Sequence, residues 1–266
     1  MTTRRQENFL CQEADRPSTG FLALECLPKN RLVPYAVCMM TQLLSSQLRS
    51  KMPLLTALLL SSGLSVTMWI ARAAYTRQWS YFSLNWNLVL AWIPLLLALA
   101  AWLLIQRSAL LPVVIILLGG WLLFLPNSAY IITDLIHLRA RYGAPLWFDA
   151  LLVFSFAWNG LVVGLTSVWI VQSLVERWFG AVAGWLLAGG ALFSSAFGIY
   201  LGRFLRWNSW DIVTEPKALM KDILPRLLNP FAHPQTLAVT LLLAGMLLMI
   251  YVTMTLLGRV RWENHH

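Results

Sequence analysis

Two segments of the chain combine side chains that could do acid–base chemistry or bind anions. In the first segment, five polar residues recur at intervals of three and four positions: Asn127, Tyr130, Asp134, His137 and Arg141. This spacing predicts one polar helix face. We assign Asp134 and His137 to catalysis, because histidine titrates near neutral pH and a carboxylate can donate or accept a proton. Asn127 and Tyr130 would bind the substrate. The alternative is an amphipathic helix whose polar side faces water.

The second segment follows the fifth predicted membrane span. It contains two arginines three residues apart, Arg203 and Arg206. Paired guanidinium groups bind phosphate or carboxylate through two hydrogen bonds each, so both arginines are predicted to bind substrate. Asn208 would contribute an amide to the same site, and Asp211 would take part in catalysis. Alternatively, the arginines snorkel to the membrane interface beside the tryptophans of this segment.

Asp149, at the start of the fourth predicted span, is the remaining candidate for substrate binding. Alternatively, it caps the N-terminus of its helix, where the helix dipole favours a carboxylate. We predict no cofactor. A divalent metal is the open alternative, and since His137 is the one usable histidine, magnesium or manganese would suit Asp134 and its neighbours better than zinc.

The elements that position these residues must lie in a membrane. The chain has 266 residues, of which 59% are hydrophobic and 12% charged, against roughly 25% charged in an average soluble domain. Its mean hydropathy is +0.66. A soluble globule of this size could not bury so much apolar surface, and disorder requires the opposite composition. The three cysteines, all before residue 40, do not form a disulfide scaffold.

A helix needs about 20 mostly apolar residues to cross the hydrocarbon core of a bilayer, and unpaired strands cannot cross it. We therefore predict an all-α fold, a polytopic bundle of about six transmembrane helices. Pro126 is expected to break or kink the third span. Residues 1–52 are expected to be a polar, basic tail without fixed structure, and residues 259–266 a short C-terminal tail. The six spans of the transmembrane domain, residues 53–258, are 53–71, 86–105, 109–132, 147–175, 180–201 and 237–257.

Small residues recur at every fourth position in the fifth predicted span: Gly190, Ser194, Gly198 and Gly202. Small side chains at this period allow two helix backbones to approach closely. The stripe would bring Arg203 against a neighbouring helix of the same chain, or it would support a homo-oligomer. Asn159, inside the fourth span, is explained by helix packing in the same way.

Four ordered segments resemble the signature segments of a bacterial family of uncharacterised multi-pass integral membrane proteins. The resemblance covers residues 80–225 and departs from the family pattern at Ser128-Ala129, where an Ala-Pro pair is expected. It implies a bacterial plasma (inner) membrane protein and supplies no activity. The four segments are Asn85–Pro94, Pro126–His137, Trp147–Trp158 and Tyr200–Asp211.

Three functions remain open. The first is a membrane-embedded enzyme that acts on a lipid or lipid-linked anionic substrate at the face formed by loops 1–2, 3–4 and 5–6. The second is a transporter or permease for a small anion or metabolite, and the third is a non-catalytic membrane subunit or assembly factor. Membrane lipids are the expected partners. Nucleic acid is not, because the basic residues are scattered at membrane flanks.

The three functions predict different geometries. An enzyme requires Asp134, His137, Arg203 and Asp211 to converge on a lipid-accessible cavity. A transporter requires a polar path that continues inward past Asn159. A scaffold requires the same charged side chains to pair with one another and leave no cavity.

Overall fold

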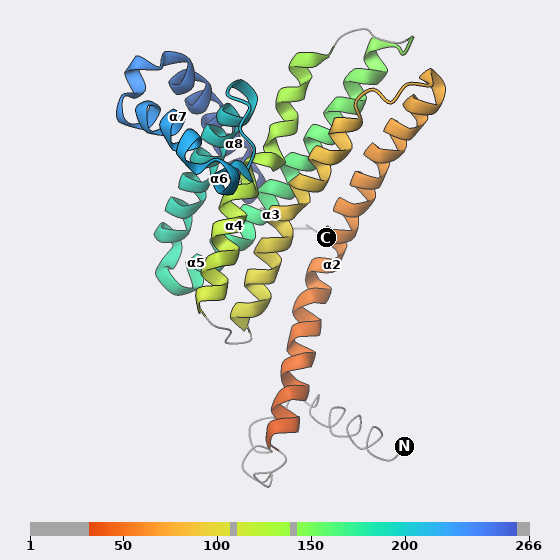
Figure 1. The fold of residues 1–266 in the computed structure, drawn as a ribbon. Helices are drawn as coiled ribbons and strands as arrows, with labels where there is room; N and C mark the ends of the chain where they lie inside the picture. The colour runs from red at the N-terminus through yellow and green to blue at the C-terminus, as the bar shows by residue number, and fades with distance from the viewer. Residues whose placement is uncertain (1–31, 107–110, 139–142, 260–266) are drawn as a thin grey trace, which may run out of the picture. The chain divides into compact units, whose positions relative to one another are not determined.

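The computed structural model describes residues 32–106, 111–138 and 143–259. All regular structure in these residues is helical (Figure 1). The elements in chain order are α2 (Leu32–Thr76), α3 (Phe82–Gln106), α4 (Leu111–Tyr130), the 3-10 helix η1 (Ile131–His137), α5 (Leu146–Phe204), α6 (Asp211–Thr214), α7 (Pro216–Leu228), the 3-10 helix η2 (Pro230–Ala232) and α8 (Pro234–Arg259).

Five helices of the described chain are long and apolar enough to cross a membrane, which confirms the predicted all-α membrane fold. These candidate spans are Met52–Thr76, Phe82–Ile105, Leu111–Ile136, Leu146–Phe204 and Pro234–Gly258.

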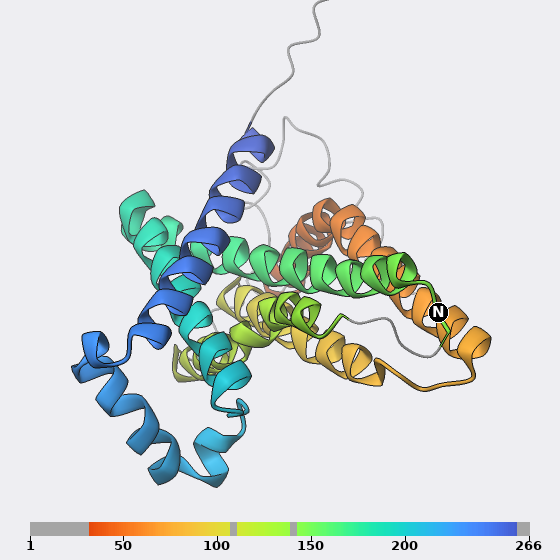
Figure 2. The same ribbon diagram turned by 90° about the horizontal axis from the view of Figure 1, so that it is seen from above.

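The longest span, α5, consists of two arms. Gly180 interrupts its helical backbone with φ 84° and ψ 170°, a left-handed φ that glycine adopts without a steric penalty. The first arm (residues 146–179) and the second arm (residues 181–204) run in different directions on either side of this turn (Figures 1 and 2). They correspond to the fourth and fifth predicted spans.

The chain divides into two compact units, Met1–Leu59 and Leu60–His266. The described part of the first unit is the N-terminal portion of α2, which begins at Leu32. Residues 32–52 of the predicted tail are therefore helical. This stretch has no glycine, and its one proline, Pro34, lies in the first turn, where the missing amide hydrogen costs no helical hydrogen bond.

In the second unit, α3 packs against α4 and the first arm of α5, and α5 also packs against α4 and α8. An apolar cluster lies where the end of α2, the start of α3, η1 and the first arm of α5 meet. Its buried members are Trp69, Leu84, Leu88, Ala91, Ile131, Leu152, Val153, Phe156 and Ala157.

Helix α4 contacts both arms of α5 at glycines of α5, where no side chain separates the helices. Ser128 of α4 lies against Gly160 and Gly164 of the first arm, so closely that a Cβ atom on Gly164 would lie 2.6 Å from the Cβ of Ser128. On the second arm, a Cβ atom on Gly198 would lie 2.5 Å from the Pro126 ring. These contacts are the close backbone approach that small residues permit between membrane helices.

Pro126 was expected to break or kink the third span; it does not break it, because α4 runs through Pro126 to Tyr130. The proline ring lies against Gly198, where the absence of a side chain leaves room for it. The change of geometry comes after Tyr130, where the chain tightens into the 3-10 helix η1.

Gly164→Ala is expected to destabilise the protein by about 1–3 kcal/mol, the usual cost of overpacking a core contact. Gly119→Ala on α4 is the matched control, since a Cβ atom there meets nothing within 4 Å. Helix propensity alone predicts that the control stabilises by up to about 1 kcal/mol. Thermal unfolding in detergent measures both variants, and equal melting temperatures would contradict the contact with Ser128.

Candidate functional site

An ion pair joins η1 to the last turn of α5. The Arg203 Nη2 atom lies 2.8 Å from Asp134 Oδ1, and the two side chains are 12% and 17% exposed. Arg203 Nη1 donates a hydrogen bond to the Tyr130 hydroxyl at 3.4 Å, and its guanidinium carbon lies 5.1 Å from the centre of the Tyr130 ring. Asn87 of α3 donates to the other carboxylate oxygen of Asp134 at 3.2 Å. Three of the predicted site residues therefore meet in one place.

The glycine stripe of α5 explains how Arg203 reaches this position. A Cβ atom on Gly202 would lie 3.3 Å from the Tyr130 ring, so the second arm passes close to α4 at its C-terminal end. Arg203 follows directly and faces the neighbouring helix, as the stripe predicts. Gly190 has nothing within 4 Å of a Cβ position, so the intramolecular contact uses the C-terminal half of the stripe.

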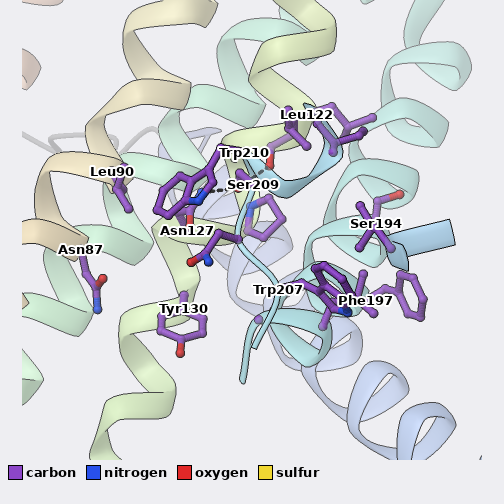
Figure 3. Close-up of a pocket in the computed structure, with 18 of the residues that line it drawn as sticks. Asn87, Leu90, Leu122, Asn127, Tyr130, Ser194, Phe197, Trp207, Ser209 and Trp210 are labelled. Atoms are coloured by element: carbon purple, nitrogen blue, oxygen red, sulfur yellow. Dashed lines mark hydrogen bonds between the residues drawn. The ribbon is translucent and has the colours of Figure 1, made fainter. Parts of the chain in front are cut away.

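A cavity of about 340 Å³ lies beside this ion pair, between α3, α4, the second arm of α5 and the segment that follows it (Figure 3). Its lining is amphipathic. Apolar and aromatic side chains make up most of the wall, and none of the described lining residues carries a formal charge at neutral pH. The polar part of the wall consists of Asn87, Asn127, Tyr130, Ser194, Asn208 and Ser209.

Asn127 and Ser209 fasten the 205–210 segment to α4. The Asn127 amide donates to the Ser209 hydroxyl at 2.9 Å, and Ser209 donates to the carbonyl oxygen of Leu123 at 3.2 Å (Figure 3). Asn127 also donates to the Phe124 carbonyl oxygen at 3.2 Å. The cavity wall is therefore built by hydrogen bonds between side chains that sequence analysis placed in two separate segments.

The Asp134–Arg203 ion pair is next to the cavity but is not part of its lining. Asp134 and Arg203 do not line it, whereas Asn87 and Tyr130 line it and contact them. In Figure 3 the Tyr130 hydroxyl is on the side of its ring away from Asn127. Between the cavity and the pair, Asn87 contacts Asp134 and Tyr130 contacts Arg203.

Asp149 forms a buried ion pair with Arg72. Its side chain is fully buried, and it accepts hydrogen bonds from Arg72 Nε at 2.5 Å and Arg72 Nη2 at 3.0 Å. The Arg72 guanidinium carbon also lies 4.8 Å from the centre of the Tyr81 ring. This bidentate pair joins the end of α2 to the start of α5 and is separate from the cavity lining. These contacts do not support the predicted role of Asp149 in substrate binding, because Arg72 donates to both carboxylate oxygens.

Arg72 is not among the predicted site residues. The signal that was missed is a reciprocal one: a single arginine ends one apolar span and a single aspartate begins another. Neither charge is stable alone at the edge of hydrocarbon, so each requires a partner.

Asp211 bonds within its own segment. Its carboxylate accepts the Asn208 backbone amide at 2.6 Å and the Thr214 hydroxyl at 3.3 Å, which fixes the turn into α6. Arg206 is exposed and has a left-handed φ of 62°. Arg203 faces Asp134 instead of sharing an anion with Arg206. The predicted catalytic role of Asp211 and the predicted arginine pair are not supported by these contacts.

Two residues of the predicted polar stripe, His137 and Arg141, cannot be placed. The side chain of His137, and Arg141 as a whole, lie outside the described residues. Among the described residues, no three His, Cys, Asp or Glu side chains lie close enough to hold a metal ion. Asn159 donates to the Ser61 carbonyl oxygen at 3.2 Å and the Ser65 hydroxyl at 2.8 Å, which agrees with its predicted role in helix packing.

These features define a class: a multi-pass α-helical membrane protein with an amphipathic cavity where three spans end. The chain belongs to the family described as "Protein of unknown function (DUF1361)", whose sequence model matches residues 86–250. This match confirms the resemblance to an uncharacterised membrane-protein family. Searches of curated proteins and of solved structures found no match.

Asp149→Asn is expected to destabilise the protein by about 3–5 kcal/mol, because removal of one partner leaves a buried charge uncompensated. The double variant Arg72→Met/Asp149→Leu should cost less than the single one, since it removes both charges. Asp222→Asn is the matched control: the Asp222 side chain is 41% exposed, and exposed pairs contribute about 0–1 kcal/mol. Thermal unfolding in detergent compares the three variants. A double variant that unfolds earlier than Asp149→Asn would contradict this assignment.

Proposed function

We propose that the protein binds the head of a lipid or lipid-linked molecule in the cavity, in a bacterial plasma membrane. The observation that carries this proposal is the amphipathic lining of a cavity at the membrane edge. Trp86 lies near the start of the span Phe82–Ile105, and Gly202 lies near the end of the span Leu146–Phe204. A ligand at this depth touches the headgroup and acyl regions of the bilayer together.

The size and chemistry of the cavity favour a particular part of such a molecule. A volume of about 340 Å³ lies at the lower end of the range of ligand pockets, roughly 300–1,000 Å³. Indole rings offer apolar faces, while amides and hydroxyls donate and accept hydrogen bonds. An uncharged lining of this kind suits a glycerol-like or sugar-like group better than a bare phosphate, which would lose its hydration without a cation to replace it.

Ser194→Trp tests the cavity directly, because Ser194 lines it and an indole there would fill much of its volume. Native mass spectrometry of protein extracted in mild detergent should show at least about a tenfold loss of retained lipid, equivalent to about 1.4 kcal/mol. Leu186→Trp is the matched control, since Leu186 is 72% exposed on the same arm of α5 and does not line the cavity.

Equal lipid retention by the two tryptophan variants would overturn the proposal. A second pair of variants tests the polar wall without adding bulk. Asn127→Leu removes an amide from the lining, whereas Asn85→Leu makes the same change at a residue of α3 that does not line the cavity. Only Asn127→Leu is expected to lower retention.

Enzymatic action on the bound molecule is the second candidate function. The observation that favours it is the contact of Asn87 and Tyr130, both in the wall, with the Asp134–Arg203 pair. Through their hydrogen bonds, Asn87 and Tyr130 would link a bound substrate to Asp134 and Arg203. A transporter is less favoured, because the Asn159 amide is engaged in packing instead of lining a path.

Asp134→Asn separates binding from turnover. Because Asp134 does not line the cavity, the variant is expected to retain lipid as the wild type does. If the protein is an enzyme, wild type incubated with its retained lipid gives a mass-shifted product and the variant gives at least about a hundredfold less, as for loss of a group in acid–base catalysis. Equal product from both proteins would remove Asp134 from the mechanism.

A further inference from the structure

Helix α7 has a wide apolar face with two edges in different surroundings. Leu219 and Ile223 form one edge and line the cavity. The next positions around the helix form the other edge, which we call the outer edge of α7. Its residues Met220, Leu224 and Leu227 are 55%, 47% and 58% exposed. Helix α7 thus forms a wall between the cavity and whatever covers the outer edge.

The attachment of α7 to the rest of the second unit is sparse. Its main packing partners are α6 and η2, its neighbours in the chain, and Figures 1 and 2 show it at the margin of the helices. One hydrogen bond joins it to the cavity wall, from Trp207 Nε1 to Asp222 Oδ2 at 2.9 Å. An element held this way can move at a small cost in lost contacts.

The position of α7 in the chain indicates what covers its outer edge. One membrane span ends at Phe204 and the next begins at Pro234, so the segment between them stays near one membrane surface. Exposed apolar side chains at that depth are covered by lipid when no protein covers them. An amphipathic helix in the interface buries its apolar face at the boundary of headgroups and acyl chains.

The charges of α7 favour an anionic surface. Lys217 and Lys221 are exposed, lie one turn apart and flank the outer edge. Among the described residues, neither lysine takes part in an ion pair, whereas Arg226 donates to the Asp222 carbonyl oxygen at 2.5 Å. Two ammonium groups beside an apolar edge are the arrangement that binds anionic lipid headgroups.

We propose that α7 docks its outer edge on the anionic lipid surface of the membrane and lies between that surface and the cavity. We propose also that the cavity takes its ligand from this lipid leaflet. The second part rests on the proposed function. The first part, docking of the outer edge, stands on the exposure and charge of α7 alone.

Lipid-borne quenchers test the docking in the full chain. Cys11, Cys26 and Cys38 are replaced by serine, and a fluorophore is attached to Leu224→Cys on the outer edge or to Ala218→Cys, which is exposed on the opposite face. The protein is placed in nanodiscs of phosphatidylcholine with or without phosphatidylglycerol, with a doxyl group on the acyl chain near the headgroup. Strong quenching is expected at position 224 and weak quenching at position 218.

The lysines are tested in the same assay. Lys217→Gln/Lys221→Gln should weaken docking about 30-fold in anionic nanodiscs. Each lysine near such a surface contributes about a fivefold factor, and the two factors multiply. The shift should vanish in pure phosphatidylcholine. Arg177→Gln is the control for a basic residue that is exposed at the turn between the two arms of α5.

Three outcomes would overturn the proposal. They are no quenching at position 224, equal quenching at positions 218 and 224, and protection of position 224 that depends on protein concentration, which would show a second copy of the chain on the outer edge. Failure of the proposed function has a different signature, since it leaves Ser194→Trp with full lipid retention while the quenching at position 224 remains.

Discussion

The close contact of α4 with both arms of α5 is the constraint on which the rest of the site depends. Ser128 meets two glycines of the first arm, and Pro126 meets Gly198 of the second. With no hydrophobic driving force between helices in lipid, such packing relies on the close approach that small residues allow. Because α4 packs against α5 on two sides, the position of its C-terminal turn is fixed. That position in turn fixes Tyr130, at the end of α4, and Asp134, in the 3-10 helix that follows.

Two arginine–aspartate pairs neutralise the charged side chains at the ends of these packed helices. Asp134 meets Arg203, and Asp149 meets Arg72 in a fully buried pair. Each pair joins two elements that are distant in sequence, so a basic and an acidic residue fix the relative positions of helix ends as well as neutralising each other. The consequence for function is that the charged side chains identified as catalytic or anion-binding candidates are largely engaged, while amides, hydroxyls and indoles line the cavity.

The sequence predicted the membrane fold, the approximate spans and the packing of Arg203 against a neighbouring helix, because helical periodicity and four-residue spacing of small residues are local signals. It could not predict which carboxylate pairs with which arginine. Arg72 and Asp149 are far apart in the chain, and their pairing depends on how α2 and α5 cross. The contacts of Asp211 were missed for a different reason: it bonds to Asn208 and Thr214, its near neighbours in the chain, in a turn that periodicity does not reveal. The continuation of α4 through Pro126 could not be predicted, because the room offered by Gly198 is a tertiary feature.

The separation of neutral and charged groups at this end of the bundle limits which ligand could satisfy the proposed function. An anionic group inside the cavity would exchange its hydration for amides and indoles, and without a cation in the described lining that exchange costs several kcal/mol. The same group outside the cavity meets Lys217 and Lys221 on α7 at little desolvation cost. A molecule that satisfies both conditions has an uncharged polar portion and an anionic portion joined to an apolar chain. Such a molecule is a lipid or a lipid-linked compound, whereas a small free anion would satisfy only the lysines and leave the cavity without a role.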